Sequence, residues 1–213
     1  MVRLWGRKTS INVQKVMWTL AELGLAYEHI EAGGAFGRTD SPEFFALNPN
    51  RLVPVLEDDG FALWESSAIV RYLACRYGKG SLAPEEPHAH ALADQWMEWA
   101  GSSLYHDIIS VCFLGLVRTR AAARNLTAIA EAAKRTGERL LLLDAHLASR
   151  SYILGDVLTI ADIPAGVLMY RYYSLPIDRP KLPNVEAWHQ RLRSRPEYLA
   201  NVEIDYSPLK VAD

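Results

Sequence analysis

The sequence predicts two folded parts, an α/β domain at the N-terminus and an all-α helical bundle after it. Three observations in the 213 residues lead to this prediction. Short strand-like segments alternate with helical periodicity only as far as about residue 78. Residues 79–87 are rich in Gly and Pro, which is typical of a linker. Beyond the linker, residues 88–213, every periodic segment has helical spacing.

The N-terminal domain, residues 1–78, contains strands and helices in an order that identifies its fold class. Apolar residues recur at helical spacing from Val13 to Leu23, and Gly24 ends that helix. The alternating segment that follows is expected to be parallel to the first strand, through a right-handed crossover. This order is thioredoxin-like. The expected elements are a strand at 2–5, a helix at 13–23, a strand at 26–30, a short helix from 41, strands at 51–56 and 61–64, and a helix at 66–77.

The helical domain begins with two long apolar segments. A capping box follows at Thr159 and Asp162, with Asp where Glu or Gln is usual, and it introduces a further helix. We interpret both residues as structural. The expected helices run over 89–117, 121–148, a segment beginning near 162, 184–193 and 195–202.

The stretch from residue 51 to residue 70 has the strongest signal for ligand binding. Pro54 stands at a strand entry, and the Val53-Pro54 bond is the best candidate for a cis peptide. A cis bond would turn the N–H and C=O of Val53 toward an extended, peptide-like ligand. Ser66 is expected to cap the next helix, whose N-terminus attracts a carboxylate, while Glu65 attracts an ammonium. Together these groups predict a receptor for an amino-acid head and a peptide backbone.

Composition excludes several classes of function. The formal charge of −2 provides no polybasic surface for nucleic acid. No apolar run approaches the ~20 residues of a membrane helix, and the N-terminus is not typical of a signal peptide. The two cysteines, Cys75 and Cys112, favour a reducing, cytoplasmic location. No Cys/His spacing indicates a metal site.

The whole chain resembles the cytosolic glutathione transferases, of the bacterial, phi and theta-like kind. That resemblance implies a glutathione transferase fold, usually a homodimer, with glutathione as co-substrate and no other cofactor. The tripeptide matches the receptor described above. The resemblance depends on Gly6, Ser10, Asn12 and Lys15 after the first strand, on Asn48, Pro49, Val53 and Pro54, on Glu65 and Ser66, and on Thr159 and Asp162.

The resemblance also assigns catalytic residues. A free thiol has a pKa near 8.5, and lowering it by about two units takes about 2.7 kcal/mol. One or two hydrogen bonds to the sulfur provide this. By resemblance Ser10 is the catalytic hydroxyl and Asn12 assists it. From the local sequence alone, Ser10 or Thr9 could equally cap the first helix, and Thr9 remains a second candidate for the sulfur contact.

The second substrate, a hydrophobic electrophile or a peroxide, is expected in an apolar cleft between the domains. By resemblance the long helices border this cleft through Tyr105, His106 and Phe113, and Arg7 adjoins it from a loop. Arg51 is a candidate for the glycyl carboxylate of glutathione. Each of these residues could instead be an ordinary core or surface residue.

The function implied is glutathione transfer in detoxification. Two alternatives remain open: glutathione-dependent disulfide reduction or isomerisation at the same site, and a non-catalytic interaction module with the same fold.

Overall fold

The N-terminal domain is built on a four-stranded sheet. The computed structural model describes residues 1–212. Its strands are ordered β2-β1-β3-β4, with β1 parallel to β2 and antiparallel to β3, and with β3 antiparallel to β4. The thioredoxin-like order predicted from the sequence is confirmed. The strands are β1 (Val2–Trp5), β2 (Tyr27–Ile30), β3 (Val55–Asp58) and β4 (Phe61–Trp64).

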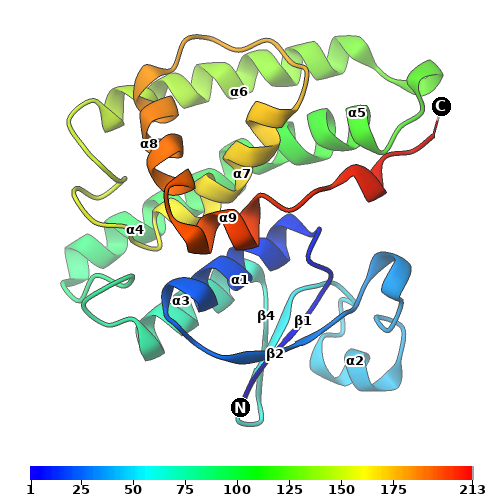
Figure 1. The fold of residues 1–213 in the computed structure, drawn as a ribbon, viewed down its shortest axis with the longest axis vertical. Coiled ribbons are helices and arrows are strands. Elements are labelled where there is room, and N and C mark those ends of the chain that lie inside the picture. Colours follow the sequence, from blue (N-terminus) through cyan, green and yellow to red (C-terminus); the bar gives the residue numbers. More distant parts are fainter. Residues whose placement is uncertain (213) are drawn as a thin grey trace.

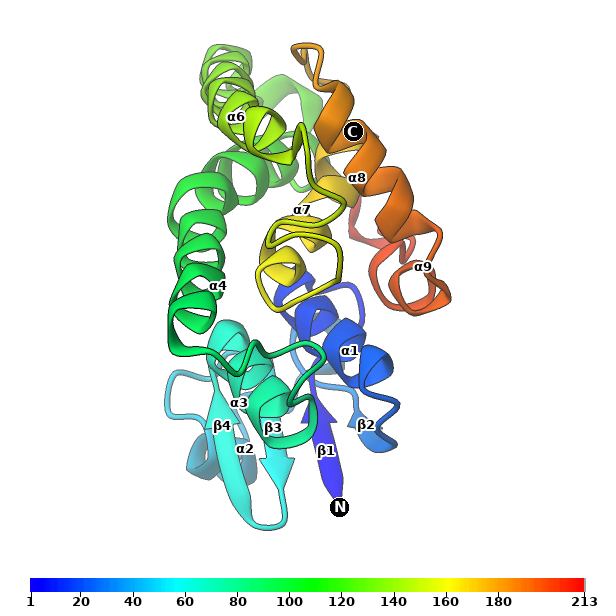
Figure 2. The ribbon, with the colours of Figure 1, turned by 90° about the vertical axis from the view of Figure 1, so that its left-hand side faces the viewer.

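Helices cover both faces of this sheet. The helices α1 (Ile11–Glu22) and α3 (Ser66–Tyr77) lie between the sheet and the helical domain (Figure 2). Their apolar faces form a core with the strands, listed as Val2, Leu4, Val13, Val16, Met17, Leu20, Leu56, Ile69 and Leu73. The short helix α2 (Pro42–Leu47) packs on the opposite face, where Phe44 contacts Trp5 and Val55.

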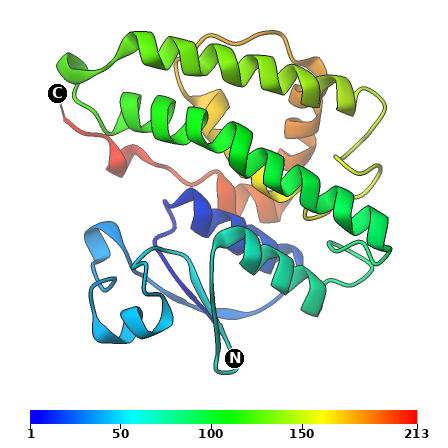
Figure 3. The same cartoon turned by 180° about the vertical axis from the view of Figure 1, so that it is seen from behind.

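The second domain is entirely helical, as predicted, and stands above the sheet in Figure 1. Its first helix runs without a break from Pro87 to Val117 beside α6 (Figure 3), with π-helical turns in its middle. Its parts are α4 (Pro87–Trp99), η2 (Ala100–Leu104), η3 (His106–Phe113) and α5 (Leu114–Val117). The other helices are α6 (Leu126–Leu147), α7 (Asp162–Ser174), α8 (Pro183–Arg193) and α9 (Pro196–Val202). The predicted domain boundaries, at 78 and 88, stay predictions.

The second long helix begins later than expected. Residues Ala121–Ala123 form a short 3-10 turn instead of helix. The reason is local, because Asn125 is the N-cap of α6 and its side chain accepts a hydrogen bond from the Ala128 N–H at 3.0 Å. The predicted start at residue 121 is therefore wrong by five residues.

The helix Pro87–Val117 is long and apolar enough, by length and composition, to cross a membrane. This qualifies the expectation that no apolar run approaches such a length. Its packing is that of a core helix, since it lies against α6 and α7. The carboxylate of Asp107 on this helix is buried and binds Arg135 and Arg139 of α6.

The two domains meet along α1. Trp18 is fully buried and packs edge-on against Tyr198 of α9, with ring centroids 4.9 Å apart. Gly166 of α7 lies so close that an added Cβ would be 2.9 Å from the Trp18 ring. This packing holds the C-terminal half of α1 against α7 and α9, and residues 9 and 10 precede the other end of the helix.

Candidate functional site

The predicted backbone clamp is present. The Val53-Pro54 peptide bond is cis, which confirms the prediction. Pro54 is buried, and the preceding Leu52 carbonyl accepts a hydrogen bond from Asn48 Nδ2 at 2.8 Å. Within residues 1–212 no hydrogen bond uses the N–H or the C=O of Val53. Both groups are therefore available to pair with an extended ligand.

The beginning of α3 differs in detail from the prediction. The N-cap is Glu65, at φ 71°, and Ser66 is already the first helical residue. The expectation that a serine caps this helix through its side chain is therefore wrong. Glu65 is exposed, and a non-glycine residue at positive φ is typical of a functional position. The first N–H groups of the helix have no intrahelical partners and make an anion-binding end.

Ser66 instead joins a buried polar network with α1. Its hydroxyl lies 3.4 Å from both Asn12 Oδ1 and Lys15 Nζ. Lys15 Nζ donates to Asn12 Oδ1 at 3.1 Å, and Asn12 Nδ2 lies 3.4 Å from the Tyr105 hydroxyl. The side chain of Asn12 thus connects the α3 end of the site to the long helix of the second domain.

Lys15 places a cation beneath the site. Its side chain is 4% exposed, and its Nζ lies 5.4 Å from the centroid of the Tyr105 ring. Burial lowers the pKa of Lys15 from 10.5 to about 8, against the opposing fields of Glu65 and Glu98. The ammonium is still charged at neutral pH, and it favours a ligand carboxylate nearby.

Replacing Lys15 with Met should raise the free energy of unfolding of the unliganded protein by roughly 1–3 kcal/mol at pH 7, because the cost of burying the charge disappears. Between pH 8 and 10.5 the unfolded lysine binds a proton that the folded one has lost, so the native protein gains stability as pH rises. The difference in the free energy of unfolding between the Lys15→Met variant and the original protein should therefore shrink between pH 8 and pH 10.5. Urea unfolding at pH 7 and pH 10 measures this, with exposed Lys134→Met as control. A pH-independent difference would contradict the expectation.

The predicted catalytic hydroxyl lines a small pocket between the domains. The pocket has a volume of about 270 Å³ and is bordered by Thr9 and Ser10. Ser10 is the N-cap of α1, yet its side chain makes no capping hydrogen bond. The alternative in which Ser10 caps through its hydroxyl is therefore not what the structure contains. Among the predicted second-substrate residues, Arg7, Tyr105 and Phe113 line this same pocket.

Two predicted residues lie apart from this arrangement. His106 is exposed and does not line the pocket, because it is on the outward side of the helix that carries Tyr105. The Arg51 guanidinium pairs with Asp40 at 3.0 Å and lies over the Phe45 ring, and Arg51 does not line the pocket. A ligand carboxylate would therefore compete with Asp40 for this guanidinium.

Among the lining residues of the pocket that sequence reasoning missed, the charged ones are Arg118 and Arg171. Arg118 follows the long helix and carries no local signal. Arg171 could have been noticed, because it is a charged residue inside the otherwise apolar segment of α7 from Ile163 to Tyr173. A buried charge in such a segment usually has a partner or a function.

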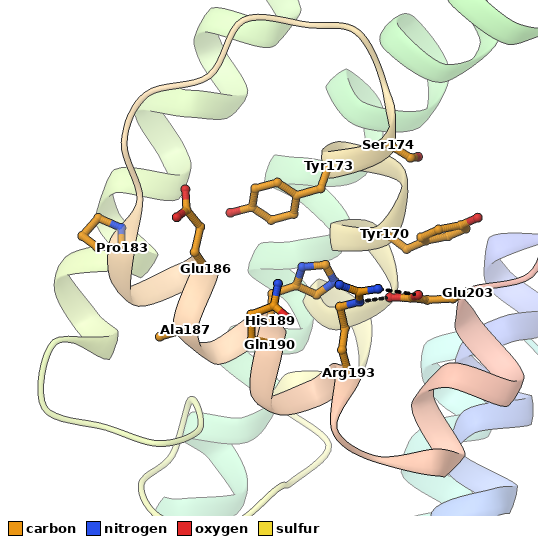
Figure 4. A pocket seen from close by; sticks show the side chains of 10 residues that line it. All are labelled: Tyr170, Tyr173, Ser174, Pro183, Glu186, Ala187, His189, Gln190, Arg193 and Glu203. Atoms are coloured by element: carbon orange, nitrogen blue, oxygen red, sulfur yellow. Dashed lines mark hydrogen bonds and ion pairs between the residues drawn. The ribbon is translucent and has the colours of Figure 1, made fainter.

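A larger cavity, of about 670 Å³, lies away from these residues, between α7 and α8 (Figure 4). Arg193 and Glu203 form an ion pair at its edge. None of the residues predicted to act in chemistry lines it. Over residues 1–212 there is also no group of three or more His, Cys, Asp and Glu side chains that could hold a metal ion.

Comparisons with known proteins agree with this geometry. Two family descriptions match: "Glutathione S-transferase, N-terminal domain" over residues 1–75 and "Glutathione S-transferase, C-terminal domain" over residues 93–196. The chain is 41% identical over 198 residues to glutathione S-transferase GstB of Escherichia coli K12, covering 92% of this chain and 95% of that protein.

Solved structures give the same result. A theta class glutathione S-transferase from Xanthomonas axonopodis pv. citri, with glutathione bound, superposes with a TM-score of 0.90 at 45% identity, covering 96% of this chain and 98% of that one. Its apo form superposes with a TM-score of 0.83 at 40% identity, covering 96% and 97%. The motifs, the fold and these matches lead to one conclusion: the chain belongs to the glutathione S-transferase family.

Proposed function

We propose that this protein is a glutathione transferase whose tripeptide site lies between Val53 and the N-terminus of α3. The unused N–H and C=O of Val53 would pair with the backbone of the cysteinyl residue. The first N–H groups of α3, with Ser66 and the charge of Lys15 behind them, would hold the γ-glutamyl carboxylate, and Glu65 its ammonium. The bound glutathione in the 45%-identical relative supports this reading.

The Ser10 hydroxyl would donate to the glutathione sulfur and stabilise it as thiolate. The observation that supports this most directly is that the Ser10 side chain borders the pocket and is not used as a helix cap. Asn12 would act as a positioning residue, because its amide joins Tyr105, Lys15 and Ser66 in one network. Arg51 stays a weaker candidate for the glycyl carboxylate.

The second substrate would enter the pocket beyond Ser10, whose walls include Ile11, Phe113 and Leu114. Its electrophilic carbon, or a peroxide oxygen, would be attacked by the thiolate. We favour transfer over disulfide reduction because neither cysteine borders the pocket: Cys75 is exposed on α3 and Cys112 is buried in η3. No further cofactor is required for this chemistry.

Turnover assays test this proposal. The protein should bind to immobilised glutathione and conjugate it to chlorodinitrobenzene, with little activity on a hydroxyethyl disulfide. The reverse preference would support the reductase alternative. Binding without turnover of either substrate would support the interaction module, and absence of glutathione binding would contradict the whole proposal.

We further propose a homodimer that acts in detoxification in the cytoplasm. Exposed apolar side chains on β4 and α4, namely Phe61, Trp64 and Leu92, support an interface there. Arg71 of α3 is bound within the chain to Asp94 and Glu98, so we do not assign it to this interface. The two unpaired cysteines agree with a reducing compartment. Light scattering should find twice the mass of one chain.

A further inference from the structure

The pocket beside Ser10 is cationic. Arg7, Arg118 and Arg171 line it, and none of its other lining residues is acidic. Over the described part of the chain, 1–212, none of the three forms an ion pair with a carboxylate. Eight arginines elsewhere form such pairs: Arg3, Arg51, Arg71, Arg76, Arg135, Arg139, Arg193 and Arg195. Four more donate to backbone carbonyls: Arg124, Arg150, Arg179 and Arg191. What distinguishes Arg7, Arg118 and Arg171 is that they share one pocket without a carboxylate partner among the described residues.

Arg171 is the most unusual of them. Its side chain is 1% exposed, its Nη2 donates to the Thr9 carbonyl at 3.4 Å, and its Nη1 is buried without a hydrogen-bond partner in residues 1–212. Aromatic rings surround the guanidinium carbon, with ring centroids at 4.3 Å for Tyr206 and 4.9 Å for Phe113. Arg171 thus has a buried N–H group that lacks a hydrogen-bond acceptor within the described residues, next to residues 9 and 10. A buried, unpaired donor of this kind is costly unless a ligand supplies the acceptor.

The charges around the pocket also favour the binding of an anion. Burial lowers the pKa of Arg171 to about 10, so the group is still charged at neutral pH. Burial also lowers the pKa of Arg7, and the like charge of Arg118 lowers it further. Asp205 acts on Arg171 only through its field, without an ion pair. Three cations around a pocket of about 270 Å³, two of which repel each other, create a potential that attracts an anion.

We propose that the second substrate of this enzyme is a small electrophile bearing a carboxylate. This rests on the glutathione transferase function proposed above. The carboxylate would pair with Arg171 and Arg118, while the apolar body would contact Ile11, Phe113 and Leu114. In the proposed glutathione site the γ-glutamyl carboxylate is held at the end of α3 and Arg51 is the candidate for the glycyl carboxylate, so neither carboxylate accounts for these arginines.

The reaction is a substitution. The glutathione sulfur forms a new bond to the electrophilic carbon, and the leaving group, such as chloride, departs with the electron pair of the broken bond. The thiol proton passes to solvent. No oxidant, reductant or further reactant enters, and the carboxylate of the substrate is unchanged.

A matched pair of substrates tests the proposal on the unmodified protein. Chlorodinitrobenzoate and chlorodinitrobenzamide have the same leaving group and similar size, but only the first is an anion. After each kcat/KM is divided by the rate constant without enzyme, the benzoate should be preferred at least about tenfold, since one charge-assisted hydrogen bond gives 1.5–3 kcal/mol. Equal rates, or preference for the amide, would overturn the proposal. Failure of both substrates would instead reject the proposed transferase function.

Variants of the arginines test which of them causes the preference for the benzoate. Arg118→Gln should lower the ratio of kcat/KM for the benzoate to kcat/KM for the amide about five- to tenfold, mainly through the KM of the benzoate. Arg120 is exposed and lies outside the pocket, so Arg120→Gln makes the same charge change there and should not alter the ratio of the two kcat/KM values. Arg171→Gln should abolish the preference, with thermal unfolding to verify its fold. If the Arg118 and Arg171 variants slowed both substrates equally, the arginines would serve the glutathione thiolate and the proposal would be wrong.

Discussion

Replacing Ser10 with Ala should lower kcat for conjugation by roughly 10- to 100-fold, because the thiolate loses one charge-assisted hydrogen bond of about 1.5–3 kcal/mol. The apparent pKa of bound glutathione should rise, so the loss should be largest at low pH and smaller at high pH. The KM for glutathione should change little, since in the proposed site the tripeptide is held mainly by Val53, Glu65 and Ser66. A pH series of kcat and of the thiolate absorbance measures both effects.

The same variant separates catalysis from capping. When a serine caps a helix through its side chain, replacing it with alanine lowers the free energy of unfolding of the protein by about 1 kcal/mol. Ser10 makes no such bond, so the free energy of unfolding should change by less than about 0.5 kcal/mol. Thr9→Val is the matched control. If that variant lost the turnover and Ser10→Ala kept it, the catalytic hydroxyl would be that of Thr9.

Replacing Asp162 with Ala should destabilise the protein by about 3–5 kcal/mol, the largest stability effect expected here. Its carboxylate is fully buried and accepts hydrogen bonds from Ile153 N–H at 2.9 Å, Thr159 N–H at 3.0 Å and Trp188 Nε1 at 2.9 Å. Burial raises the pKa of Asp162 to about 6, while these donors oppose the rise. The carboxylate is therefore ionised at neutral pH, and its removal leaves three buried donors unpaired.

Urea unfolding measures this loss. Asp162→Asn should be intermediate, because the amide keeps one acceptor oxygen but directs an NH₂ group toward a donor. Exposed Asp156→Ala changes the same charge on the loop before α7 and should alter the free energy of unfolding by less than about 0.5 kcal/mol. A loss below about 1 kcal/mol for Asp162→Ala would show that Thr159 and the surrounding packing hold this helix start without the carboxylate.

Much of the fold was predictable from local sequence. The start of β1, the end of α1 at Gly24, and the capping of α2 by Ser41 depend on residues within one or two turns. The cis Val53-Pro54 bond was recognisable because such bonds belong to proline. The wrong helix start predicted at residue 121 also comes from reading local sequence. The alanine-rich run at 121–123 has helical propensity, although α6 begins only after its N-cap, Asn125.

The candidate site was predictable only in part. Some site residues belong to motifs that can be recognised in the sequence alone, namely Ser10, Val53, Glu65 and Ser66. The family resemblance assigned roles to them. His106 was misplaced because the side of a long helix that faces a pocket depends on how that helix packs. Arg118 and Arg171 were missed because they reach the pocket from two helices that are far apart in the sequence, α5 and α7.

By itself the amino-acid order of this protein determined the class of most elements, the family and the cis bond before Pro54, because these depend on short motifs and neighbouring residues. Only the tertiary structure decided which charges surround the space beyond Ser10. Three arginines from positions 7, 118 and 171 meet there through the packing of α1, η3 and α7. The burial of Arg171 and the repulsion between Arg7 and Arg118 exist only in the folded protein, so no local pattern in the sequence predicts them.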